Sequence, residues 1–135
     1  MIHYLADTNI LGYFVRSSHP PLQARMHAAL QREEVAISVI TRAETRYGLA
    51  RLNANDKRRQ SVALLLASLP ALPWSPDAAD CYGEIAARLE LSGLSIGIMD
   101  TLIAAHALTS NLIVVTHNTR HFERIAGLKL EDWTV

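Results

Sequence analysis

The first dozen residues contain a short, mostly apolar segment that ends abruptly at an acid. Residues 2–6 have the character of a buried strand, and apolar side chains then recur at helical spacing from Ile10 to Val15. Asp7 therefore lies where a strand gives way to a helix, which is where open α/β sheets bind their ligands. The position also suits a helix N-cap, because an aspartate there accepts a hydrogen bond from a free backbone N–H. Acids at the ends of other strands would favour the ligand-binding interpretation.

Short apolar strands alternate with helical segments along the rest of the chain. Strand–helix–strand units form parallel sheets covered by helices, so the chain is predicted to adopt an α/β fold with a mainly parallel central sheet. The predicted strands after the first are residues 35–39, 72–74, 112–115 and 128–130, and the main predicted helices are residues 20–32, 41–52, 61–69, 76–93 and 97–108.

Composition restricts the class of protein. The chain has 135 residues, half of them hydrophobic, which is enough for one domain over residues 1–135. Thirteen basic and thirteen acidic residues give a net charge of zero, so any basic surface must be local. A single cysteine, Cys81, excludes an intrachain disulfide. No basic-then-apolar leader opens the sequence and no apolar run is long enough to span a membrane, so a cytoplasmic location is expected.

Four oxygen-bearing side chains are predicted to meet at one edge of the sheet. Asp7 follows the first strand, Glu44 follows the second, Asp100 lies in the first turn of a helix, and Asn118 follows strand 112–115. Three carboxylates gathered there would repel one another unless one is protonated or a cation lies between them. Oxygen ligands select Mg²⁺ or Mn²⁺, and these ions serve phosphoryl chemistry by orienting a phosphodiester and activating water.

Several motifs follow one another along the whole chain. They are Leu5-Ala-Asp7-Thr8-Asn9, Ser38-x-x-Thr41-x-x-Glu44 with Tyr47-Gly48, Ile96-Gly-Ile-Met-Asp100-x-x-Ile-Ala104-Ala105-His106-Ala107, and Val115-Thr116-x-Asn118-x-x-x-Phe122 through Leu128-x-Leu-Glu131-Asp132-Trp133. In this order and spacing they resemble the PIN-domain ribonucleases, and among them the VapC toxins of bacterial type II toxin–antitoxin systems.

This resemblance implies a three-layer α/β/α sandwich and a Mg²⁺-dependent or Mn²⁺-dependent endoribonuclease. It also implies an RNA substrate and a homodimer. A VapB-like antitoxin is expected to form a hetero-oligomer with the toxin and to place its C-terminal tail in the active groove. Asp7 and Asp100 match the family's main metal-binding acids, and Glu44 matches the third acid. The chain departs from the common pattern at Asn118, where many members carry a fourth acid. Glu123, about one helical turn further on, is an alternative source of that charge.

Residues around the acids are candidates for substrate contact. The basic ones could equally be solvated ion-pair partners, because Arg42 and Arg46 have helical i,i+4 spacing. The spacing of His117 and His121 matches one of the two ligand pairs of a zinc site, but the chain has no second pair. The alternative is that these two histidines line the substrate groove. The candidate substrate-binding residues are Thr8, Asn9, Arg42, Arg46, Thr116, Arg120 and Glu123.

Two helices carry predictions about burial. In helix 41–52, the apolar face is predicted to include Ile40 and Tyr47. Helix 61–69 is apolar nearly all round, so it is predicted to lie deep in the core or against a second copy of the chain. The basic stretch 57–59 is predicted to be a solvated loop.

Two other classes share a strand that ends in an acid. A haloacid-dehalogenase-type phosphohydrolase needs a second acid two residues after the first, where this chain has Asn9. A phosphoaspartate receiver module needs paired acids after its first strand and a lysine after its last, and only Lys129 lies near the C-terminus. A receiver-like module or another metal-dependent phosphoryl hydrolase remains the alternative at this stage.

Overall fold

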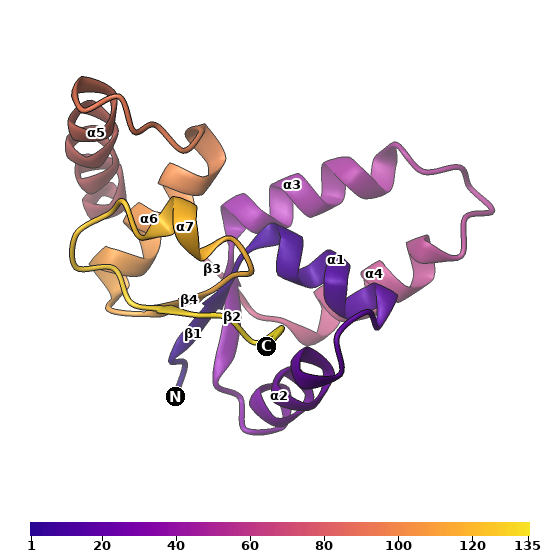
Figure 1. Cartoon of the computed structure of the whole chain (residues 1–135). Helices are drawn as coiled ribbons and strands as arrows, with labels where there is room; N and C mark the ends of the chain where they lie inside the picture. The colour runs from indigo at the N-terminus through magenta and orange to yellow at the C-terminus, as the bar shows by residue number, and fades with distance from the viewer.

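A five-stranded parallel sheet forms the centre of the molecule (Figure 1). The computed structural model describes all residues from Met1 to Val135. The strand order is β3-β2-β1-β4-β5, and every neighbouring pair is parallel, so all the carboxyl ends lie at one edge. The strands are β1 (Tyr4–Ala6), β2 (Val35–Ser38), β3 (Ala71–Leu72), β4 (Ile113–Val115) and β5 (Leu130–Glu131).

Helices cover both faces of this sheet. Successive strand residues point to opposite faces, so Leu5 and Val114 enter one hydrophobic cluster while Ala6 and Val115 enter the other. The first four helices pack on the Ala6 face and the last three on the Leu5 face, which confirms the predicted three-layer sandwich. The helices are α1 (Thr8–Arg16), α2 (Pro20–Gln31), α3 (Val39–Ala50), α4 (Arg58–Ser68), α5 (Pro76–Leu91), α6 (Ile98–Ser110) and α7 (Thr119–Phe122).

The basic stretch 57–59 is partly structural, so the prediction of a solvated loop was wrong for two of its residues. Helix α4 begins at Arg58, whose guanidinium lies 2.7 Å from Asp56. Arg59 donates hydrogen bonds to the carbonyls of Leu49 and Leu52 at 2.8 and 2.9 Å. Leu49 is in the last turn of α3 and Leu52 lies just beyond its C-terminal end, where a cation is favourable. Arg59, in the first turn of α4, therefore caps the C-terminal end of α3.

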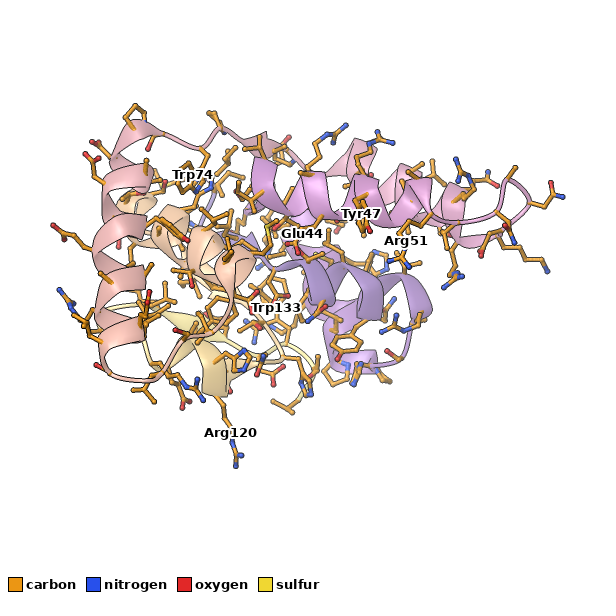
Figure 2. The ribbon with its side chains drawn as sticks, turned by 90° about the horizontal axis from the view of Figure 1, so that it is seen from above. Glu44, Tyr47, Arg51, Trp74, Arg120 and Trp133 are labelled. Atoms are coloured by element: carbon orange, nitrogen blue, oxygen red, sulfur yellow. The ribbon has the colours of Figure 1, made fainter.

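The predicted apolar face of α3 was right for Ile40, which packs against one core cluster, and wrong for Tyr47. Tyr47 is 65% exposed and lies under the guanidinium of Arg51 at 5.5 Å, on the outer surface of the helix (Figure 2). The buried residues of α3 are Thr41 and Leu49. Apolar spacing did not identify this face because a threonine occupies one of its buried positions.

Helix α4 buries one side only. Leu65 and Leu66 are buried in the core, whereas Leu64 is 62% exposed. An exposed leucine beside exposed alanines on the outer side of α4 is a surface that a second copy of the chain can cover.

None of the helices has the length and apolar content needed to span a bilayer.

We expect the chain to form a dimer at tens of micromolar, in which the outer face of α4 is buried. Light scattering of the chain without any partner measures its mass. Leu64→Asp should shift the mass toward monomer, because burying an unpaired carboxylate is unfavourable. Leu91→Asp, at a leucine that is 90% exposed on α5, is the matched control. A monomeric wild type would contradict this expectation.

Candidate active site

Asp7 lies at the carboxyl end of the central strand β1 and begins helix α1. Its side chain accepts a hydrogen bond from the backbone N–H of Ile10 at 2.9 Å, and its own N–H donates to the carbonyl of Val115 at 3.0 Å. Asp7 is only 3% exposed. It therefore serves as the predicted N-cap, and it also lies at the sheet edge where α/β folds bind ligands.

Two further acids act on Asp7. Burial is the main cause that raises the pKa of Asp7 to about 6, and hydrogen bonds from Thr116 and Ile10 oppose this shift. The negative charges of Asp100 and Glu44 are smaller causes that raise the pKa further. Both acids therefore act on Asp7 at this edge, although the three do not form a closed metal-binding group.

Glu44 is held toward α1 by a hydrogen bond. The hydroxyl of Thr8 donates to Glu44 Oε1 at 2.6 Å, and both residues are half-buried. Figure 2 shows Glu44 on the side of α3 that faces α1. Because Thr8 directly follows Asp7, this contact fixes the second acid next to the first.

Asp100 and Asn118 are connected through a histidine. The side-chain amide of Asn118 donates to His121 Nδ1 at 2.8 Å, and the same nitrogen lies 3.8 Å from Asp100 Oδ2. Burial raises the pKa of Asp100, and the adjacent imidazole opposes that shift. The backbone N–H of Asn118 donates to Thr116, which also bonds Asp7. Asn118 therefore contacts the residues that position the acids, and its amide is directed at His121.

Four of the predicted substrate-binding residues do not contact the acids at the carboxyl edge of the sheet. Arg42 donates to the carbonyl of Leu66 in α4 at 3.5 Å. Arg120 extends from the molecule into solvent (Figure 2). Arg46 and Glu123 are exposed, and no contact joins either of them to the three acids.

A buried histidine couples the helices that carry two of the acids. His106 Nδ1 lies 2.8 Å from the hydroxyl of Ser38, and the two residues are 2% and 0% exposed. Ser38 ends β2 and caps α3 by accepting a hydrogen bond from Ile40 N–H at 3.1 Å. Because His106 is in α6, this contact holds α6, which carries Asp100, against the start of α3.

The donor set at this edge suits a hard cation. No group of three or more histidine, cysteine or acidic side chains is arranged as a ready-made metal cage. Magnesium does not require such a cage, because it keeps several waters and usually binds one or two carboxylates plus substrate phosphates. The pKa of Asp7 is raised by its burial and, less, by the charges of Asp100 and Glu44, and a bound cation would stabilise its charged form against both effects. The carboxylates of Asp7 and Asp100 therefore fit Mg²⁺ or Mn²⁺.

Comparison with known proteins identifies the family. The family model described as the PIN domain matches residues 4–128. The chain is 33% identical over 130 residues to Ribonuclease VapC2 of Rickettsia felis, covering 96% of this chain and 97% of that protein. The chain belongs to the PIN-domain family, in its VapC branch.

Two other relatives extend this result. The tRNA(fMet)-specific endonuclease VapC of Shigella flexneri is 32% identical over 134 residues, covering 99% of this chain and all of that protein. The crystal structure of DNA-bound VapBC from Salmonella typhimurium superposes with a TM-score of 0.89 at 32% identity, covering 98% of this chain and 99% of the matched chain. These full-length matches confirm the predicted PIN-like fold and exclude a receiver-like fold.

Sequence reasoning gave His121 a possible place in the substrate groove but not beside Asp100, and it quoted His106 in a motif without giving it a role in this PIN-domain site. The spacing from Asn118 to His121 is one helical turn, so a predicted helix after the last long strand could have suggested their contact. His106 has no comparable signal, because its partner Ser38 is 68 residues away.

Proposed function

We propose that this chain is a Mg²⁺-dependent endoribonuclease that acts as the toxin of a VapBC-type toxin–antitoxin pair. The observation that supports this most directly is the position of Asp7 at the carboxyl edge of the sheet, where burial and, to a smaller extent, the charges of Asp100 and Glu44 raise its pKa. The names and full-length similarity of the relatives support the same activity.

Each acid has a distinct role in the proposed cleavage. Asp7 and Asp100 would hold Mg²⁺, which when bound offsets the developing negative charge on the scissile phosphate and activates water. Glu44 would orient the attacking water, since Thr8 fixes one of its carboxylate oxygens at 2.6 Å. His121, whose ring is oriented by the Asn118 amide, would lie beside Asp100 on the other side. Mn²⁺ has the same ligand preference and could replace Mg²⁺.

The proposed partners follow from the relatives. Because the Salmonella protein crystallised as DNA-bound VapBC, we propose a VapB-like antitoxin as the inhibitor of this chain. The Shigella relative is named for tRNA(fMet), so tRNA is the first RNA class to test.

Expression in a bacterial cell tests the proposed toxin function. Induction without an antitoxin should arrest growth and create new RNA 5′ ends at discrete positions, and an Asp7→Ala variant should do neither. Growth arrest by the variant, or arrest without new RNA ends, would contradict the proposal.

The position that departs from the family pattern provides a separate prediction. Asn118→Asp should tighten Mg²⁺ binding about tenfold, or roughly 1.4 kcal/mol, because it adds a negative charge next to the residues that hold Asp100. Calorimetric titration of Mg²⁺ into both proteins measures the difference. Asn55→Asp adds the same charge to an exposed turn and serves as the control. Equal affinities would indicate that position 118 does not act on the metal.

A further inference from the structure

A polar pocket adjoins the proposed cleavage site and is not explained by the acids. It has a volume of about 380 Å³ and lies between α1 and the start of α7. Asn9 in this pocket is two residues after Asp7, and Asn118 in the pocket contacts the histidine beside Asp100. The lining residues are Asn9, Tyr13, His117, Asn118, Thr119 and Arg120.

Three aromatic rings lie together at the pocket: Tyr13 and His117 line it, and His19 lies at its edge. The ring centroid of Tyr13 lies 5.6 Å from that of His117 and 5.2 Å from that of His19, and the two histidine rings are 6.0 Å apart. The guanidinium of Arg16 lies over the Tyr13 ring at 5.1 Å. This ring cluster is at the surface, since Tyr13 and His19 are half-buried and His117 is exposed.

The imidazole of His117 is held in a fixed orientation. Its Nδ1 lies 2.9 Å from Thr134 Oγ1 and 3.3 Å from Asp132 Oδ2. The Thr134 hydroxyl donates to Asp132 Oδ1 at 2.6 Å, so Thr134 accepts from the Nδ1–H of His117. Nε2 is then left as a free acceptor, and 49% of the side chain remains exposed. A rigid aromatic ring at the surface loses little entropy when it binds a planar group.

This chemistry matches an unpaired base of RNA. Single-stranded bases are recognised by stacking on aromatic rings and arginine planes, combined with hydrogen bonds to their edges. The ring cluster and Arg16 provide planar surfaces, while Asn9 and Thr119 provide polar groups. Because the chain has no net charge, a site that recognises bases adds affinity that the overall charge does not supply.

We propose that this pocket binds an unpaired nucleobase next to the scissile phosphate and thereby contributes to the choice of cleavage site. The proposal rests on the proposed RNA substrate. Tyr13 is six residues after Asp7, which places it about 9 Å further along the helix axis. An RNA strand that crosses the acids can therefore place a neighbouring base in the pocket.

Fluorescent RNA provides the test. The probe is a single-stranded RNA hexanucleotide with 2-aminopurine at one position, varied along the series, and EDTA prevents cleavage. One position should be quenched on binding to the wild type. Tyr13→Leu and His117→Ala should each weaken binding of that RNA about tenfold, since one stacked base contributes roughly 1–3 kcal/mol. Tyr13→Phe keeps the ring and should stay within about twofold of the wild type.

Matched controls separate stacking from a general loss of structure. Tyr82→Leu changes a half-buried tyrosine of α5, and His27→Ala changes an exposed histidine of α2 that contacts Phe14. Both should bind the RNA as the wild type does. If Tyr13→Leu does not fold, His117→Ala provides the test.

The outcomes also separate this inference from the proposed nuclease function. If the wild type cleaves RNA in Mg²⁺ but quenches no position, or if the pocket and control variants bind alike, the base pocket is wrong and the nuclease stands. If one position is quenched and the pocket variants lose it, but no RNA is cleaved in Mg²⁺, base binding by the pocket stands, whereas the nuclease function and the role of the pocket in choosing a cleavage site are wrong.

Discussion

Asp7→Asn and Asp100→Asn should each lower kcat/KM for RNA cleavage by a factor of about a thousand or more. Each change removes one negative charge from the proposed cation site, and a catalytic metal ion contributes several kcal/mol of transition-state stabilisation, at about 1.4 kcal/mol per tenfold in rate. Asparagine is also a good N-cap, so Asp7→Asn should keep the hydrogen bond from Ile10 and the start of α1. The change therefore separates the two roles of this residue.

Single-turnover cleavage of a labelled RNA measures the effect, and thermal melting checks the fold. Asp77→Asn is the matched control, because Asp77 is an exposed acid in the first turn of α5. That variant should cleave at the wild-type rate. Near-normal cleavage by either site variant in Mg²⁺ would remove the basis for the proposed active site.

The second large effect is on the stability of the metal-free protein. The pKa of Asp7 rises from 3.8 to about 6 on folding, so the folded state favours the neutral acid. The contribution of Asp7 to the free energy of unfolding is largest below the pKa that this group has in the unfolded state. It falls as pH rises from about 4 to 6 and then stays low. The loss at pH 7 is about 3 kcal/mol, taken as an upper figure. Asp7→Asn should therefore stabilise the metal-free protein at pH 7.5 by up to that amount, and by almost nothing at pH 4.

Urea unfolding in EDTA at a series of pH values measures this difference. Comparing the wild type with Asp7→Asn at each pH cancels other titrating groups, including Asp132, whose pKa is lowered mainly by hydrogen bonds from Thr134 that outweigh its burial. Adding Mg²⁺ at pH 7.5 should stabilise the wild type more than the variant, because a ligand bound only to the folded state raises its stability. A difference in the free energy of unfolding that does not change with pH would show that folding does not raise the pKa of Asp7.

The sequence predicted the sheet and the acids because both depend on local patterns. The short apolar segments before Asp7 and after Asn111 are easily recognised, and parallel pairing then requires their carboxyl ends to meet. The ends of elements were less accurate. Strand β3 is only two residues long, and α4 begins three residues earlier than apolar spacing indicated, since Arg58 and Arg59 are bound by Asp56 and the end of α3.

The parts of the site that were missed depend on contacts between distant segments. His121 approaches Asp100 only because α7 packs against α6, where Phe122 shares one buried cluster with residues 103–105 and 107. The ring of His117 is fixed by Thr134, which is 17 residues away in the chain. Such contacts have no periodic signature, so composition and spacing identify the acids but not the residues that position them.

Mapping of RNA 5′ ends after incubation with the purified chain tests the central claim most directly. The claim is that Asp7, Glu44 and Asp100 form a divalent-metal nuclease site. The account predicts discrete new ends in Mg²⁺, none in EDTA, and none with Asp7→Asn in Mg²⁺. The same new ends produced in EDTA or by Asp7→Asn, or no new ends from any RNA class in Mg²⁺ or Mn²⁺, would contradict it.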